Sequence, residues 1–596
     1  MRGWIDRACG RMLLDDIVFL SSPRALRRLR RTLVVLVALA LAGWVFRSFG
    51  DIGFNPTDDG YVIAQSWRIL HGAVPHRDVI SPRPLGSAYL HALDFAVPLP
   101  LMEASRLLAT GQIVLYSMLL AALVYDLSPG RWSPAQLVGA VGSVLVNLHS
   151  FPLMAWMTVD ALTLAAAGFL LLGVGLARRR VDRVYLGLVL IGGATLMKQS
   201  FAPVGAVALL WISRDGRRRR VASVGRLLRA AAVLVMPMVV YAGAIACAGG
   251  LDAMRTQLGG AAPPKHWFPT LHAHDLPMLA AVAVAFGGLQ IIERLETRGA
   301  GRLGSLAVTA SVALAAFGSL DVFVVALGGH LAYYGTWGIG LFWMLLLAVA
   351  IDVVGRRVAD ERMLAVLGLA WASTLSWGYA VPNLLGGTMA LALLRLLWST
   401  RLAARLYRGF LGELAAAAVA VAALTVVVQT FVPARLRRVY FEAPAAELTS
   451  AAGDAIPAFG RIRTDERTGT YLRQMLSCLR RFPAGRVAVV PDNPFLYPAL
   501  GMANPLPIDW LWPAELRGSE ERLLEAARRL DREGDYLLLV QTVGGYDVAF
   551  RDPPGEPLAP ADLGESDATV RAVTGVLRGA RTPCEAFVAI HAPRVD

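Results

Sequence analysis

The sequence has little charge for its length. Asp, Glu, Lys and Arg make up only 17% of its 596 residues, whereas hydrophobic residues make up 56%, and the mean hydropathy is +0.52. A soluble chain usually carries about 25% charged residues, so an ordinary soluble protein is excluded. Apolar runs long enough to cross ~30 Å of hydrocarbon recur between residues 33 and 432. The chain is therefore predicted to be a polytopic α-helical membrane protein.

Several common motifs are also missing. The four cysteines are Cys9, Cys247, Cys478 and Cys584, and none stands at the spacing of a metal-ligand pair. We find no Gly-rich phosphate loop, which argues against a nucleotide-binding fold, and no internal repeat of the kind found in many transporters. No small-residue cleavage site follows the apolar run 33–46, so the N-terminus is predicted not to be a cleavable signal.

The arginines predict an orientation. The net charge is +14, but the basic residues cluster between apolar runs, as in cytoplasmic loops, and not as a nucleic-acid-binding surface. RALRRLRR precedes the first span, so the N-terminus is predicted to be cytoplasmic. About thirteen spans are predicted, an odd number that places the C-terminal region outside. These spans cover residues 33–49, 105–125, 134–148, 160–177, 184–197, 201–213, 230–248, 277–292, 306–326, 339–354, 363–377, 386–398 and 411–431.

The composition divides the chain into three parts. Residues 1–32 form a cytoplasmic segment, 33–432 the transmembrane region with a long first outer loop at 50–104, and 433–596 a small extracytoplasmic α/β domain. In the last part, strand patterns at 486–491, 535–541 and 585–592 alternate with helical patterns, which predicts a small, mostly parallel sheet. If this part is outside, Cys478 and Cys584 can form a disulfide; two free buried thiols are the alternative.

The first outer loop carries the most polar chemistry. Asp58 and Asp59 lie just outside the first span, where a carboxylate pair can accept a proton or hold a divalent cation. The structural alternative is a solvated turn, because PTDDG is a good helix-entry sequence with Thr57 or Asp58 as the N-cap. A single sequence does not decide between these interpretations.

Two further groups of residues extend the candidate site. His76, Arg77, Asp78 and Arg83 form a polar cluster in the same loop, and a guanidinium fork suits phosphate; interfacial charge near lipid headgroups is the alternative. Asp160 begins a span at the same predicted membrane level as Asp58. It is either a functional acid facing water or a helix N-cap favoured by the helix dipole.

Lys198 and Gln199 interrupt a nearly continuous apolar stretch on the predicted outer side. An ionisable residue in such a place is a functional candidate, here for the phosphate of a lipid, although a lysine that snorkels to the interface is the alternative. His272, His274 and Asp275 are weak candidates for a metal site, because their spacing is short and a distant partner is missing.

Taken together, these segments resemble the GT-C superfamily of integral-membrane glycosyltransferases. The resemblance is to the bacterial branch that includes aminoarabinose transferases and protein O-mannosyltransferases. It rests on PTDDGYVIAQSWRILHGAVPHRDVISPRPLGSAYL, WMTVDALTLAAAGFLL and GGATLMKQSFAPVGA, and on the tail segment RVAVVPDNPFLYPALGMANPLPIDWLWPAEL. This sequence has Asp58–Asp59 where the family commonly has Asp-Glu, which leaves the catalytic carboxylate open between the two.

The resemblance implies a reaction and its partners. A hexosyl or pentosyl group would pass from a polyprenyl-phosphate donor to a lipid, glycan or protein acceptor at the outer face of the cytoplasmic (inner) membrane. Asp58 or Asp59 would be the base, and Lys198, with Arg77 or Arg83, would stabilise the phosphate. The scheme involves no nucleic acid, and a divalent metal is optional in it. The main alternative is a polytopic transporter or lipid flippase without transferase activity; a non-catalytic assembly protein is the third.

Overall fold

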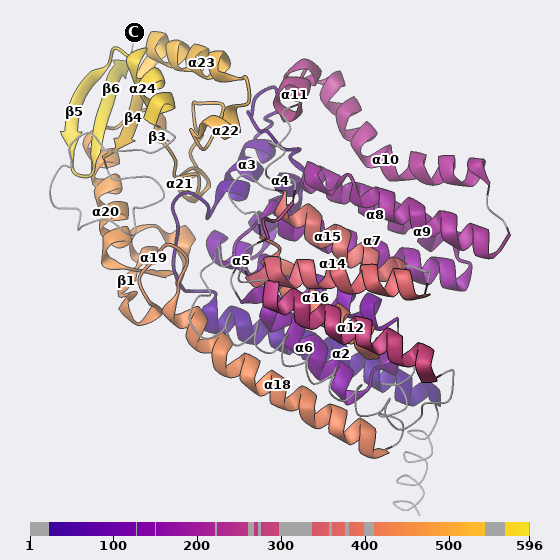
Figure 1. Cartoon of the computed structure of the whole chain (residues 1–596). Helices are drawn as coiled ribbons and strands as arrows, with labels where there is room; N and C mark the ends of the chain where they lie inside the picture. The colour runs from indigo at the N-terminus through magenta and orange to yellow at the C-terminus, as the bar shows by residue number, and fades with distance from the viewer. Residues whose placement is uncertain are drawn as a thin grey trace, which may run out of the picture.

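The computed structural model is a bundle of helices that leads into a small C-terminal sheet (Figure 1). It describes residues 23–126, 128–149, 151–220, 223–259, 268–271, 276–296, 337–356, 360–375, 381–398, 410–542 and 567–594. The helices before the sheet are α2 (Pro23–Phe49), α3 (Tyr61–Leu70), α4 (Gly86–His91), α5 (Leu101–Tyr125), α6 (Pro134–Leu148), α7 (Met157–Arg178), α8 (Val181–Met197), α9 (Val204–Arg218), α10 (Val224–Cys247), α11 (Leu251–Leu258), α12 (Leu276–Glu296), α14 (Trp337–Arg356), α15 (Glu361–Thr374), α16 (Gly386–Trp398) and α18 (Phe410–Arg437).

Helices occupy the predicted spans wherever the structure describes them; the predicted span 306–326 lies outside the described residues. Among the described residues, six helices are long and apolar enough to cross a membrane, by length and composition. They are Arg24–Phe49, Leu101–Tyr125, Met157–Arg178, Val224–Cys247, Trp337–Gly355 and Ala420–Arg437. The chain is thus a multi-pass membrane protein, while the number thirteen stays a prediction.

Two of these helices form the centre of the bundle. In α5 and α7, 72% and 61% of the apolar window is buried, against 17% or less in α2, α10 and α18. The outer helices therefore present apolar side chains where lipid would lie. These central helices, α5 and α7, contain Arg106 and Asp160, which are part of the site described below.

The predicted inner connections meet at one end of the bundle. Glu361 forms ion pairs with Arg214 at 3.1 Å and with Arg218 at 2.8 Å. Arg362 forms an ion pair with Asp126. These contacts join the connections near residues 126, 214–218 and 361, at the right of Figure 1. The structure thus confirms that these arginine-bearing connections share one end, as the charge pattern predicts.

The C-terminal region contains a four-stranded sheet in the order β3-β4-β6-β5. Its strands are β3 (Arg486–Val490), β4 (Gly534–Gln541), β5 (Ala580–Cys584) and β6 (Phe587–Arg594), with α20 (Glu466–Arg481), α23 (Glu520–Glu533) and α24 (Asp567–Gly575) nearby. The three predicted strands coincide with β3, β4 and β6. The prediction of a mostly parallel sheet is wrong: only β3 and β4 run parallel, because β5 and β6 form a hairpin that adds antiparallel to β4.

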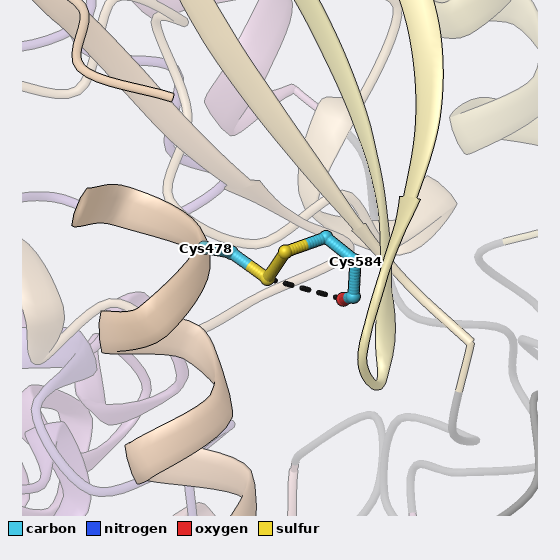
Figure 2. The surroundings of a disulfide bond; sticks show 2 residues. All are labelled: Cys478 and Cys584. Atoms are coloured by element: carbon cyan, nitrogen blue, oxygen red, sulfur yellow. Dashed lines mark hydrogen bonds between the residues drawn. A yellow bond between two sulfur atoms is a disulfide. The ribbon is translucent and has the colours of Figure 1, made fainter. Parts of the chain in front are cut away.

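A disulfide joins Cys478 in α20 to Cys584 at the end of β5 (Figure 2). The two residues are 106 positions apart, and their Cα atoms lie 5.9 Å from each other. The Sγ of Cys478 also lies 3.1 Å from the carbonyl oxygen of Cys584; a disulfide sulfur carries no proton, so this is a contact and not a hydrogen bond. Of the two alternatives that the sequence leaves open, the structure thus shows the disulfide and not two free thiols.

The first loop packs directly on the C-terminal region. Phe54 makes ring contacts with Phe459 and Phe495, and Tyr61 contacts Trp510. Gly60, with a φ of +93°, lies so close that an added Cβ would be 2.5 Å from the Cβ of Phe495. One buried apolar cluster therefore spans both parts of the chain.

Removing the disulfide should destabilise the C-terminal region. For a closed loop of 106 residues, the double substitution Cys478→Ser with Cys584→Ser should cost about 2–5 kcal/mol, since the bond restricts the unfolded chain. Thermal unfolding of the purified protein in detergent measures the loss. The matched control is Cys247→Ser, which changes an exposed free cysteine and should leave the melting temperature unchanged.

Candidate functional site

Asp58 is buried at the junction of the first loop and the C-terminal region. Its Oδ2 accepts a hydrogen bond from the hydroxyl of Tyr440, and its backbone N–H donates to Oδ1 of Asn55 at 2.8 Å. The predicted N-cap role of Thr57 or Asp58 is wrong, because α3 begins at Tyr61 with Gly60 as its N-cap. The Asp58 side chain is instead part of a tertiary contact.

Burial raises the pKa of Asp58 to about 6, with smaller contributions from the charges of Asp59 and Glu515; the hydrogen bond from Tyr440 opposes the shift. A carboxyl with such a pKa is mostly ionised at pH 7 and can still take up a proton. These are the properties of a general base.

Asp59 has a different environment. Its Oδ2 pairs with Arg106 of α5 at 3.0 Å and accepts the backbone N–H of Asn55 at 3.0 Å. Arg106 also donates to the carbonyl oxygens of Gly50 and Ile52. The carboxylate of Asp59 therefore fixes the beginning of the loop to a central helix, which is a positioning role.

Glu515 from the C-terminal region reaches the first loop. Its two carboxylate oxygens accept hydrogen bonds from the two terminal nitrogens of the Arg83 guanidinium, at 2.7 and 2.6 Å. The carboxylate also accepts a hydrogen bond from the Tyr61 hydroxyl at 2.8 Å. The side chains of Arg83 and Glu515 are 13% and 1% exposed. The guanidinium of Arg83, which was expected to bind a phosphate, thus has both of its terminal nitrogens bound to a carboxylate.

Lys198 lies in the link between α8 and η3 (Gln199–Phe201), outside both helices. It is 6% exposed, and its Nζ donates to the hydroxyl of Thr158 at 3.0 Å. Burial, and secondly the charge of Arg83, lowers the pKa of Lys198 to about 7. Arg83 therefore lies within electrostatic range of both Asp58 and Lys198.

A third carboxyl reaches this region from the end of β3. Asp492 is 2% exposed, and its Oδ2 accepts a hydrogen bond from the Thr57 hydroxyl at 2.9 Å. Burial raises the pKa of Asp492 to about 7, and the charge of Asp58 adds to the shift. The charge of Asp58 therefore acts on Asp492 across the junction.

Asp160 lies in a separate buried cluster. It is in the first turn of α7, whose N-cap is Trp156, so the prediction of an N-cap is wrong. Its Oδ1 lies 3.2 Å from Nε2 of His91 and 2.7 Å from Nε2 of Gln112. Asp160 is linked to Lys198 through its own helix, because Thr158, the partner of Lys198, precedes it by two residues.

The remaining predicted residues make contacts of their own within the first loop and with neighbouring helices. His76 is buried between Gln257 at 2.8 Å and the hydroxyl of Tyr241 at 2.9 Å, and burial lowers its pKa. Arg77 is exposed and pairs with Asp78 at 2.8 Å. The amide of Gln199 donates to the carbonyl of Pro82 at 2.7 Å, which holds the loop near Lys198.

The metal candidates are not tested. His272, His274 and Asp275 lie outside the described residues. Among the residues that the structure does describe, no group of three or more His, Cys, Asp or Glu side chains is arranged to hold a metal ion.

Sequence analysis alone missed the partners that lie far along the chain. Tyr440, Asp492 and Glu515 are 382, 435 and 432 positions from the loop residues they bind. Asp492 and Glu515 do fall in the tail segment that carries part of the family resemblance, and this was the only signal for them.

Comparisons with known proteins bear on the class. No protein family model matches the chain, and no curated protein matches its sequence. Among solved structures, ArnT from Cupriavidus metallidurans in the apo state is similar at 14% identity and a TM-score of 0.42, with 94% of this chain and 97% of that chain covered.

Two other solved structures are also similar. The oligosaccharyltransferase of Archaeoglobus fulgidus, solved with zinc and sulfate, has 12% identity and a TM-score of 0.39; the chain covers 53% of it, with 67% of this chain aligned. The arabinosyltransferase EmbB of Mycobacterium smegmatis has 17% identity and a TM-score of 0.33, covering 73% of this chain and 45% of that one. These neighbours are GT-C glycosyltransferases, the superfamily that the sequence resembles. The TM-scores are low, so the proposed function rests on the residues of the site.

The Arg83–Glu515 pair gives a direct test of the junction. Arg83→Met alone should destabilise the protein by about 3–5 kcal/mol, because it leaves the carboxylate of Glu515 buried without its cation. Arg83→Met combined with Glu515→Leu should recover part of that loss. Melting temperatures of the two variants in detergent measure the difference, and equal melting temperatures would contradict the assignment.

Proposed function

We propose that this chain is an integral-membrane glycosyltransferase that moves a sugar from a polyprenyl-phosphate donor to an acceptor at the outer face of the cytoplasmic membrane. One observation carries the proposal. Arg83, in the link between α3 and α4, acts electrostatically on both Asp58 and Lys198, and α3 and α4 lie at the end of the bundle that faces the C-terminal sheet (Figure 1). A base with a pKa near neutrality and a buried ammonium are the two groups that transfer from a phosphate donor requires.

Two features support the outer face. The arginine-bearing connections favour the cytoplasmic side by the positive-inside rule, and the site lies at the other end. In addition, Cys478 and Cys584 form a disulfide in the region that packs on the site, and such bonds persist in oxidising compartments. Both point to a C-terminal domain outside the cytoplasm, with residues 433–596 as its proposed bounds.

The proposed reaction follows from the groups present. A hydroxyl of the acceptor attacks the anomeric carbon of the donor, while its proton passes to the carboxylate of Asp58. The bond between the anomeric carbon and the phosphate oxygen breaks, and the electron pair leaves with the polyprenyl phosphate. The ammonium of Lys198 stabilises the charge that develops on this phosphate.

The environments of the two neighbouring aspartates favour Asp58 as the base. Asp59 is held by Arg106 and Asn55, whereas the carboxylate of Asp58 accepts a hydrogen bond from the neutral hydroxyl of Tyr440. We assign Arg83 to orienting Glu515 and Lys198, and Asp160 to binding substrate. His76, Arg77 and Gln199 then support the loop from outside the reacting centre.

The proposal predicts unequal effects of two isosteric substitutions. Asp58→Asn should lower kcat by about 100-fold or more, because it removes the base. Asp59→Asn should reduce activity less and should lower the melting temperature, because it weakens the contact with Arg106. Sugar transfer is measured in membranes that contain each variant, with Asp182→Asn, at an exposed carboxylate near the arginine-rich end, as the matched control.

Full activity of Asp58→Asn would refute the catalytic assignment. If the purified protein moved a lipid or sugar across proteoliposome membranes without any transfer of sugar, a transporter or flippase would replace the enzyme as the proposed function.

The proposal also predicts a bell-shaped dependence of activity on pH. Activity should rise as Asp58 loses its proton near pH 6 and fall as Lys198 loses its proton near pH 7. Lys198→Arg keeps the cation at higher pH, so its alkaline limb should move upward by about one unit or more. An alkaline limb that does not move in Lys198→Arg would exclude Lys198 as the titrating group.

A further inference from the structure

His91 is enclosed by two carboxylates. Its Nδ1 lies 3.0 Å from Oδ2 of Asp94 and its Nε2 lies 3.2 Å from Oδ1 of Asp160. The side chains of all three residues are 0% exposed. They come from α4, η1 (Ala92–Ala96) and α7, so the cluster ties the first loop to a central helix.

This geometry selects one form of the histidine. A neutral imidazole has one N–H and one acceptor nitrogen, so it can donate to only one of two carboxylates. An imidazolium donates to both, and its charge offsets one of the two buried negative charges. His91 lies outside the candidate spans. Burial disfavours its cation, but the two carboxylates outweigh this effect and raise the pKa of His91 to about 10.

Two buried acceptor atoms at this cluster lack a donor among the described residues. Oδ2 of Asp160 and Oε1 of Gln112 are buried and have no hydrogen-bond partner among the described residues. Gln112 holds Oδ1 of the same aspartate through its Nε2 at 2.7 Å. A buried acceptor without a donor is costly, and a hydroxyl of a bound substrate is a suitable donor for it.

We propose that His91, held as an imidazolium between Asp94 and Asp160, is a positioning residue that orients the Asp160 carboxylate to accept a hydroxyl of the sugar substrate. The inference rests on the proposed function, because Asp160 is taken to bind substrate there. It adds His91 and Asp94 to the machinery and gives each a distinct role: His91 orients, and Asp94 keeps the proton on His91.

The test uses the pH dependence of sugar transfer by the full-length protein in membranes. In the wild type, the two carboxylates keep His91 charged through the working range. In Asp94→Asn one of them is gone, so His91 should lose its proton at lower pH. The variant should then transfer sugar within about threefold of the wild type at pH 6 and lose a further tenfold or more relative to it by pH 9.

A second variant separates charge from packing. His91→Gln can still donate one hydrogen bond to Asp160 but has no titratable group. Its activity should be reduced by a similar factor at every pH, without the additional alkaline loss of Asp94→Asn. Asp182→Asn, at an exposed ion pair, is the matched control and should follow the wild type throughout.

The outcomes are distinct. If the wild type transfers sugar and Asp58→Asn does not, but Asp94→Asn loses the same factor at every pH, the role of His91 is refuted and the proposed function stands. If the wild type transfers no sugar, the proposed function itself fails.

Should Asp94→Asn not accumulate, thermal unfolding decides. A folded-state pKa of about 10 for His91 contributes stability that is complete below about pH 6.5 and is lost as pH rises toward 10. The melting temperature of the wild type should therefore fall more between pH 7 and 10 than that of His91→Gln. Parallel curves would overturn the proposal.

Discussion

A charge that is buried beside a membrane must be accompanied by a partner of opposite charge, and the site depends on this constraint. Leaving a buried carboxylate or guanidinium unpaired costs several kcal/mol. The structure meets the requirement through long-range pairs, among them Arg83 with Glu515 and Arg106 with Asp59. These pairs fix the first loop to the C-terminal region on one side and to the central helix α5 on the other. Asp58 has no such arginine partner among the described residues and lies between these pairs with a pKa near neutrality.

The first loop and the C-terminal region are consequently one structural unit. The loop supplies Asp58, and the C-terminal region supplies Tyr440, Asp492 and Glu515, which set its environment. Aromatic contacts such as that of Phe54 with Phe459 exclude water around the polar groups. The C-terminal region therefore does more than cover a finished site, because three of the groups that surround the proposed base belong to it. A variant that loosens the sheet should act on the environment of Asp58 even when no residue of the loop has changed.

Local patterns predicted much of this architecture, and long-range contacts account for what they missed. The apolar runs and arginine clusters anticipated the helices and the end at which their connections meet, because both depend on nearby residues. The strand pattern identified β3, β4 and β6. It missed β5, whose short sequence ARTPC lacks apolar alternation, and with it the antiparallel hairpin. The pairing of Arg83 with Glu515 was not predictable, since nothing near Arg83 distinguishes a carboxylate partner from a phosphate. The N-cap of α3 was misassigned because the hydroxyl of Thr57 donates a hydrogen bond to Asp492 instead.

The order of these residues along the chain sets the order in which the site is assembled. Arg83 precedes Glu515 by 432 positions, and every described helix from α5 to α18 is synthesised between them. During biosynthesis the guanidinium must stay in water or among headgroups until its partner emerges, since a solitary buried charge is too costly. The first loop is thus among the first segments to be synthesised and among the last to reach its final conformation. The proposed site is complete only after the C-terminal region has folded against the loop.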